Sequence, residues 1–133
     1  GIAMNIDCKK NRKFYNSYTD LCDCDMCKFY YKNIKKYYPN LAKYLYERNI
    51  DIKKPLEIGY PYLDDKGNLD YPLVQYIVIG DCKNNFLLSF DDILVSKGKL
   101  YPEVDIDESY FIMDIFNVTF DKNIINKEII KKL

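Results

Sequence analysis

The chain has 133 residues with 20 basic and 20 acidic side chains, so its formal net charge is zero. This length suits one domain built around one hydrophobic core, and the balanced charge argues against a general nucleic-acid binder. The absence of histidine excludes Ser-His-Asp triads, Cys-His nucleophiles and metal sites that use imidazole.

Residues 1–21 are predicted to form an N-terminal extension that precedes a single α+β domain at residues 22–133. Gly1-Ile2-Ala3 resembles a remnant of cloning, so we take Met4 as the native start. The rest of this extension is polar and basic, and we expect it to be loosely structured. No signal-type apolar stretch and no membrane-length run of ~20 apolar residues is present. We therefore expect a cytoplasmic protein.

Two helices are predicted after this extension. Apolar residues at three- and four-residue spacing indicate an amphipathic helix that begins near Asp23 and ends at Pro39. Asp23 or Asp25 can cap its first turn. A second helix is predicted over residues 41–48, and Asn49 suits a left-handed C-terminal cap.

The remainder of the chain predicts a sheet and a short last helix at residues 126–133. Pro61 places the first strand at an edge or at a bulge, and residues 91–101 are left open between a helical turn and a loop. The predicted strands cover residues 56–62, 73–79, 86–90 and 109–120. The expected fold is α+β, with two N-terminal helices packed on one face of a mainly antiparallel sheet of about four strands.

The last predicted strand is the longest. Alternate residues from Tyr110 to Phe120 are apolar except Asp114, so one face of this strand is expected to be buried. An aspartate on a buried face needs a hydrogen-bond partner, because an unpaired buried charge is costly. On the opposite face it would instead help to guard a sheet edge.

Three of the five cysteines lie within six residues, at Cys22, Cys24 and Cys27. Zinc in structural sites takes four ligands in tetrahedral geometry, and Cys-x-x-Cys is a usual ligand spacing. Since imidazole is absent, the fourth ligand would be Cys82, which follows the predicted central strand in a tight turn. Cys8 or a carboxylate such as Asp25 is the alternative. The odd cysteine count and the lack of a signal favour a reducing compartment in which thiols persist.

Two other interpretations of these thiols stay open. Cys24 and Cys27 form a Cys-x-x-Cys pair at a predicted helix start, where the helix dipole lowers a thiol pKa and favours redox exchange. The buried strand that precedes such motifs in thioredoxin-like folds is missing, and the flanking aspartates would raise the thiol pKa. Alternatively the thiols are free, with Cys27 as an ordinary core residue.

Charge is divided between the two halves of the chain, with +5 over residues 1–63 and −5 over residues 64–133. The sharpest acidic segment, residues 100–121, contains no basic side chain. A dipolar surface can steer a charged partner. The candidate partner-binding residues are the acids Glu103, Asp105, Asp107, Glu108 and Asp114. A solvated loop and strand face is the plainer interpretation.

Tyrosines and lysines interleave over the two predicted helices, and the chain holds 14 tyrosines in all. Tyrosine is favoured at recognition surfaces. Basic residues among aromatic ones also bind single-stranded nucleic acid by stacking and phosphate contact. A solvated lysine face opposite a tyrosine-rich core face explains the same pattern, so nucleic acid is not an expected partner.

Four short segments resemble a family of small bacterial proteins with no established activity. The residues that carry the resemblance are Cys24-Asp25-Met26-Cys27-Lys28-Phe29-Tyr30, Ile50-Asp51-Ile52-Lys53-Lys54-Pro55-Leu56-Glu57, Tyr76-Ile77-Val78-Ile79-Gly80 and the strand from Phe111 to Phe120. In size and style the chain is also similar to immunity proteins of bacterial toxin systems, an analogy that rests on no motif.

The sequence therefore predicts a non-enzymatic protein-binding domain, of the immunity type, that blocks a basic toxin domain by occlusion. The alternatives are a small protein with a structural zinc ion on Cys22, Cys24, Cys27 and Cys82, and a thiol oxidoreductase that uses Cys24 and Cys27. No catalytic residues, no membrane partner and no cofactor other than zinc are expected.

Overall fold

The computed structural model describes residues 4–133, and the predicted cloning remnant at residues 1–3 lies outside them. Within the described residues, three helices follow a first short strand and precede six further strands. The elements are β1 (Met4–Ile6), α1 (Cys8–Ser17), α2 (Asp25–Tyr37), α3 (Pro39–Glu47), β2 (Glu57–Ile58), β3 (Tyr62–Leu63), β4 (Leu69–Cys82), β5 (Leu87–Phe90), β6 (Ile93–Lys97), β7 (Tyr110–Phe120), the 3₁₀ turn η1 (Lys122–Ile124) and α4 (Lys127–Lys131).

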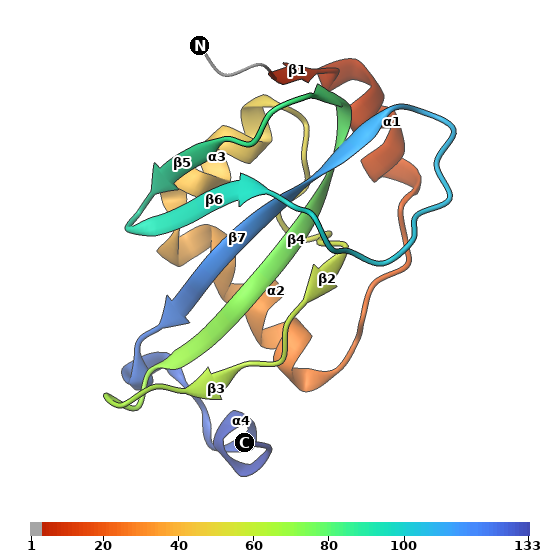
Figure 1. Ribbon diagram of the computed structural model, residues 1–133. Coiled ribbons are helices and arrows are strands. Elements are labelled where there is room, and N and C mark those ends of the chain that lie inside the picture. The colour runs from red at the N-terminus through yellow and green to blue at the C-terminus, as the bar shows by residue number, and fades with distance from the viewer. Residues whose placement is uncertain (1–3) are drawn as a thin grey trace.

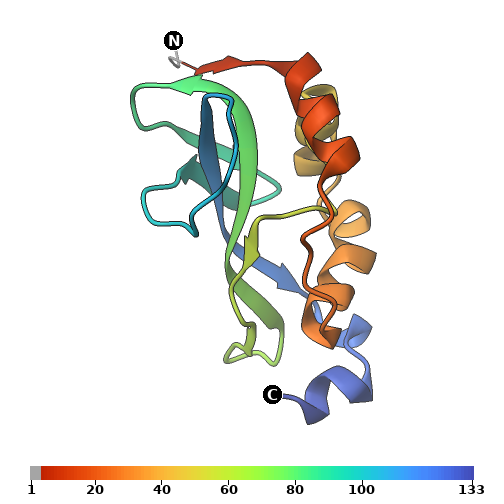
Figure 2. The ribbon, with the colours of Figure 1, turned by 90° about the vertical axis from the view of Figure 1, so that its right-hand side faces the viewer.

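The fold has two layers, with α1, α2 and α3 on one face of a curled antiparallel sheet (Figures 1 and 2). The strand order is β1-β4-β7-β6-β5, and the short strands β2 and β3 also pair with β4. The predicted α+β class is confirmed. The predicted detail of two helices and about four strands is wrong, because the described residues form seven paired strands and a further helix, α1, before α2.

The paired strands β4 and β7 run along the middle of the sheet, in register from Leu69↔Phe120 to Ile79↔Tyr110. In each strand, alternate residues face the helices, and this alternation shifts by one residue at the level where Pro72 lies opposite Asn117. Side chains of one parity therefore face the helices on one side of this level and the other face of the sheet beyond it. Proline gives no N–H to the ladder, and Asn117 adopts a left-handed backbone with φ 57°, which asparagine tolerates. The predicted single apolar face from Tyr110 to Phe120 is therefore wrong.

This reversal divides the apolar side chains between two clusters. The larger cluster, under the helices, takes Val118 and Phe120 from β7, whereas Ile112 belongs to a smaller cluster on the opposite face. The segment between β6 and β7, residues 98–109, covers that smaller cluster. Val104 and Ile106 of this segment pack inward, while the acids Glu103, Asp105 and Asp107 that alternate with them are exposed.

The helix layer is fixed to β4 by tyrosine hydroxyl groups. Tyr76 donates to the carbonyl of Ile52 at 2.6 Å and lies 2.6 Å from the hydroxyl of Tyr30 on α2, while Tyr71 donates to the carbonyl of Met26 at 2.7 Å. All of these hydroxyls are buried and partnered, as the cost of an unsatisfied buried polar group requires. The start of α2 is therefore held at a defined place over the sheet.

The boundaries of α3 come from one local and one distant signal. Asn49 has φ 58°, and Ile50 donates its N–H to Leu45 at 2.9 Å, so the predicted left-handed cap is confirmed. The helix begins at Pro39, and the backbone N–H groups of Asn40 and Leu41 donate to the carboxylate of Asp91, which lies 51 and 50 residues further along the chain. A carboxylate in this position satisfies otherwise orphaned donors and complements the helix dipole.

The hairpin of β5 and β6 occupies part of the segment that was left open between a helical turn and a loop. Asp91 and Asp92 form its two-residue turn, with φ 47° and 67°. A two-residue hairpin with positive φ at both positions matches the twist of the flanking strands. Residues 93–97 are therefore strand β6, which neither of the two expected conformations anticipated.

The N-terminal segment is ordered, contrary to the expectation of a loose extension. Asp7 caps α1 by accepting the N–H of Lys10 at 3.0 Å. Asn11 is fully buried: its side chain accepts the N–H of Ile79 at 2.8 Å and donates to the carbonyl of Arg48 at 3.0 Å. One amide therefore ties α1 both to β4 and to the end of α3.

At the C-terminus, α4 forms where a last helix was predicted, and it is shorter than expected. Lys132 pairs with the carboxylate of Asp25, which joins the end of the chain to the first turn of α2. Among residues 4–133, no helix has the length and apolar character needed to cross a bilayer.

Replacement of the buried Asn11 tests whether α1 is an integral part of the domain. We expect Asn11→Ala to lower the free energy of unfolding by about 2 kcal/mol, because the N–H of Ile79 and the carbonyl of Arg48 lose their partner in a buried place. Urea unfolding followed by circular dichroism measures this change. Asn16→Ala, at an exposed position of the same helix, is the matched control, with a change within about 0.5 kcal/mol. Equal stability of the two variants would contradict the assignment.

Candidate metal centre

The cysteines Cys22, Cys24 and Cys27 meet at the N-terminus of α2. Their three sulfur atoms all lie within 4.8 Å of one another. Cys24 is the N-cap of the helix, with an extended backbone, and its Sγ accepts the N–H of Cys27 at 3.4 Å. The spacing of three residues from the N-cap places both thiols over the same first turn, and Cys22 joins them from the connector between α1 and α2. The predicted caps Asp23 and Asp25 do not fill this role.

The three thiols differ in exposure and in proton affinity. Cys22 and Cys24 are exposed, whereas Cys27 is buried. Burial raises the pKa of Cys24, but the N–H of Cys27 and hydrogen bonds from the other two thiols outweigh it, so the net pKa is lowered. Burial and the neighbouring thiols together raise the pKa of Cys27 well above its usual value. Cys24 therefore loses its proton more readily than Cys27.

Tyr31 lies one helical turn beyond Cys27 and closes one side of the cluster. Its hydroxyl donates to the carbonyl of Cys22 at 2.8 Å, which holds the connector against α2. Burial raises the pKa of Tyr31, and negative charge on the thiols raises it further, so the hydroxyl keeps its proton. Tyr31 was not among the predicted site residues, although its spacing of four from Cys27 was a usable signal.

A cavity of about 320 Å³ adjoins the cluster on the side of β2. Cys22, Cys27 and Tyr31 form one wall, and the carboxyl-bearing residues Asp20 and Glu57 also line it. In residues 4–133, no fourth cysteine or carboxylate oxygen comes within 4.8 Å of all three sulfurs. The cluster thus offers three ligand atoms from the chain and an open side.

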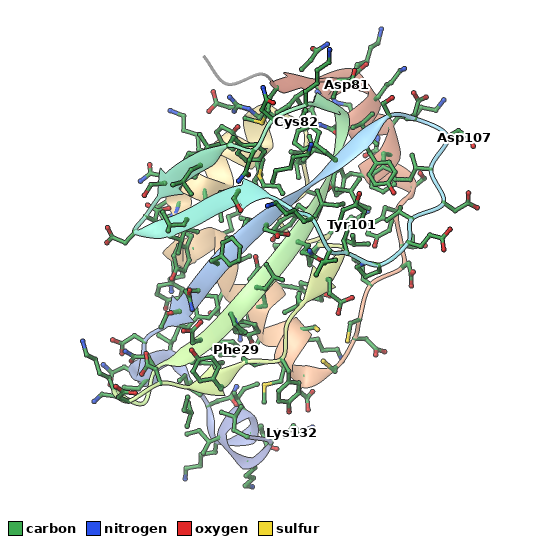
Figure 3. All side chains as sticks on the ribbon, in the orientation of Figure 1. Phe29, Asp81, Cys82, Tyr101, Asp107 and Lys132 are labelled. Atoms are coloured by element: carbon green, nitrogen blue, oxygen red, sulfur yellow. The ribbon has the colours of Figure 1, made fainter. Side chains whose placement is uncertain are left out.

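Cys82 does not reach the cluster, so its predicted role as the fourth ligand is not supported. It lies at the end of β4 beside β1, where its Sγ donates to the carbonyl of Asn84 at 3.0 Å. In Figure 3 it is at the opposite end of the molecule from Phe29 of α2 and from Lys132. The physical reason is the length of β4: Tyr71, which contacts the first turn of α2, precedes Cys82 by on the order of 30 Å of extended strand.

The remaining alternatives for a fourth ligand, Cys8 and Asp25, do not join the three sulfurs either. Cys8 lies at the start of α1. The carboxylate of Asp25 pairs with Lys132, and the hydrogen bond from that ammonium lowers the pKa of Asp25. This aspartate therefore serves to attach the chain's C-terminal end to α2.

The structure divides the five predicted partner-binding acids into three groups. Glu103, Asp105 and Asp107 are exposed along the segment that covers the second cluster (Figure 3 labels Asp107). Glu108 pairs with Lys10 of α1 at 2.8 Å. Asp114 is buried, with one oxygen accepting the side-chain N–H of Gln75 at 2.8 Å, so it contributes nothing to an exposed acidic surface.

The chain matches no family model, and no curated protein or solved structure is significantly similar to it. The resemblance to a small bacterial family and the immunity-type analogy stay predictions. The geometry described above is therefore the basis for a functional proposal.

Burial of Asp114 makes stability depend on pH with a defined sign. Burial raises its pKa, and the hydrogen bond from Gln75 only partly offsets this. When the pKa of a carboxyl is higher in the folded than in the unfolded state, the group contributes most to folding at a pH below its unfolded-state pKa of about 3.9. This contribution is lost as the pH rises through the folded-state pKa. Asp114→Asn removes the titration but keeps an acceptor for Gln75.

We therefore expect the free energy of unfolding of Asp114→Asn, relative to that of the unchanged protein, to increase between about pH 3 and pH 7. Urea unfolding at several pH values measures this difference. A difference that stays constant or decreases over the same range would contradict the buried, charge-disfavouring environment of Asp114.

Proposed function

We propose that the protein binds a zinc ion through the thiolates of Cys22, Cys24 and Cys27. The observation that carries this proposal is the approach of three sulfurs to within 4.8 Å of one another without a disulfide. A tetrahedral ion with Zn–S bonds of about 2.3 Å holds its thiolates about 3.8 Å apart. Small side-chain rotations of the two exposed cysteines would bring the sulfurs to that separation.

The surroundings of the cluster suit a thiolate-bound cation. The N–H of Cys27 already points at the sulfur of Cys24, and the N-terminal end of α2 favours the net negative charge of three thiolates around a divalent ion. Proton loss from Cys27, which burial opposes, becomes favourable only when a metal takes the place of the proton. Tyr31 keeps the connector in place behind the ligands.

The fourth coordination position would face the cavity beside β2. Structural zinc sites are closed by four protein ligands, whereas sites with three protein ligands leave one position to water or to an added ligand. This chain offers three ligands and a cavity with the acidic side chains of Asp20 and Glu57 on its wall. A water molecule bound to the metal there would have carboxylates nearby to accept its hydrogen bonds.

The metal would also act as a cross-link in the fold. The connector at residues 18–24 has no helix or strand of its own, and the carbonyl of Cys22 is its contact with Tyr31. A shared ion would fasten this connector to α2, and so would fix α1 relative to α2. Because such a site does not exist in the unfolded chain, its binding free energy becomes folding free energy.

Zinc content tests the proposal with a matched pair of variants. Protein purified without chelator is expected to carry about one equivalent of zinc, as is Cys82→Ser, whereas Cys24→Ser falls below about 0.1 equivalent. Elemental analysis measures the ratio, and removal of zinc with a chelator is expected to lower Tm. Unchanged protein with less than about 0.1 equivalent, or Cys24→Ser with as much zinc as Cys82→Ser, would refute the metal centre. Disulfide reductase activity of such metal-free protein would instead assign the thiols to redox exchange.

A second function, protein binding through an acidic surface, is favoured by one specific observation. Glu103, Asp105 and Asp107 project from the same covering segment, and none of them forms an ion pair within residues 4–133. Alternation with the inward Val104 and Ile106 holds the three acids on the outer side. Unpaired carboxylates so arranged would attract a basic partner, such as the toxin domain that an immunity protein masks.

Charge reversal tests this second proposal. The partner is sought among the products of neighbouring genes by pull-down, and the triple variant Glu103→Lys, Asp105→Lys, Asp107→Lys is expected to weaken binding at least ~10-fold through a lower association rate. Asp65→Lys, an exposed acid on the turn between β3 and β4, is the control and should bind as before. Failure of every neighbouring product to bind, or equal binding by the triple variant, would count against the acidic surface.

A further inference from the structure

A hollow of about 490 Å³ lies on the helix layer, and no cysteine lines it. Residues of α1, the last turn of α2, α3 and the segment at residues 49–54 line it. Figures 1 and 2 show α1 and α3 in the same layer, on the helix-bearing face of the sheet. The buried side chains of Tyr15, Ala42, Ile50 and Ile52 supply its apolar part.

The charge in this hollow is strongly one-sided. Four basic side chains line it, Arg12, Lys35, Lys53 and Lys54, against the single acid Asp51. None of the four forms an ion pair among the described residues. The carboxylate of Asp51 instead accepts the backbone N–H of Lys53 at 2.9 Å.

Two of the basic groups are held in place by neutral acceptors. The ammonium of Lys54 donates to the carbonyl of Tyr15 at 2.6 Å, and the guanidinium of Arg12 reaches the side-chain oxygen of Asn49 at 3.4 Å. Such bonds orient a cation without neutralising its charge. A concave, positively charged surface with fixed donors is suited to a multiply charged anion, and the fork of an arginine matches phosphate oxygens.

An exposed aromatic ring completes the hollow. Tyr46 of α3 is 79 % exposed, the most exposed of the tyrosines, and it belongs to the lining. Burial in the core therefore does not account for this residue. A flat ring beside phosphate-binding cations offers a stacking surface for a base, and the amides of Asn16 and Asn49 offer both donors and acceptors within the same hollow.

We propose that this hollow binds a nucleotide, with the phosphates on Arg12, Lys35 and Lys53 and the base against Tyr46. Lys35 and Tyr46 belong to the lysine–tyrosine pattern of the two helices, and the proposal gives these two residues a role. A phosphate group brings close to two negative charges, so a nucleoside triphosphate complements the excess of basic groups. The site is independent of the metal centre and needs no change in the cysteines.

Isothermal titration calorimetry with ATP, tripolyphosphate, adenosine and a single-stranded oligothymidylate tests the proposal. ATP is expected to bind the full chain more tightly than tripolyphosphate or adenosine. Lys35→Glu is expected to weaken ATP binding at least ~10-fold by loss of a phosphate contact and like-charge repulsion. Tyr46→Ala is expected to weaken ATP ~5- to 50-fold while leaving tripolyphosphate unchanged, since it removes stacking alone.

Matched controls separate a site from general charge attraction. Lys83→Glu and Tyr60→Ala change the same residue types at exposed positions outside the hollow, and both should bind ATP as the unchanged protein does. Circular dichroism verifies that every variant is folded, and Lys53→Glu replaces Lys35→Glu if that variant is not. The proposal is overturned if ATP does not bind at millimolar concentration, if Tyr46→Ala is without effect, or if the oligothymidylate binds more tightly than ATP.

Discussion

The paired strands β4 and β7 determine where every other part of this molecule lies. Their ladder runs from Leu69↔Phe120 to Ile79↔Tyr110, and its helix-facing tyrosines reach up to the helix backbone. Tyr71 holds the carbonyl of Met26, and Tyr76 meets Tyr30. Since these contacts fix the first two turns of α2, the ladder indirectly positions Cys24 and Cys27, and the chemistry of the site depends on the register of the sheet.

The metal proposal follows from a short list of available groups. With no histidine in the chain, thiolates and carboxylates are the strong metal ligands at its disposal, and three thiols converge at one helix terminus. Helix geometry brings Cys24 and Cys27 together, and the Tyr31 hydroxyl holds the connector segment that carries Cys22. An adjoining cavity leaves room for a fourth ligand. The same surface contains the acids Asp20 and Glu57, so solvent at the open position would be hydrogen-bonded rather than free.

Local signals in the sequence were sufficient for α2, α3 and the middle strand, because apolar periodicity and the Asn49 cap act over a few residues. Long-range contacts were not readable in this way. The order of α1 depends on Asn11 reaching Ile79 and Arg48, and the start of α3 depends on Asp91. The strand β6 was hidden because its turn uses two aspartates, Asp91 and Asp92, at positive φ in place of the usual Asn-Gly.

The candidate site shows the same limit. Cys22, Cys24 and Cys27 were recognisable as a group from spacing alone, whereas the placement of Cys82 required the path of β4 across the whole sheet. The five acids lie in one acidic segment of the sequence, which suggested one surface, yet Asp114 is buried and Glu108 is paired with Lys10. Alternation of side chains along extended backbone separates residues that are close in the chain.

X-ray absorption at the zinc edge on protein purified without chelator tests the central claim most directly, because it counts the ligand atoms around the ion. A centre built from Cys22, Cys24 and Cys27 with an open fourth position predicts a shell of about three sulfurs at ~2.3 Å and about one lighter oxygen or nitrogen atom at ~2.0 Å. A shell of four sulfurs, which would require another cysteine to join the group, or a shell of oxygen and nitrogen alone would contradict this account.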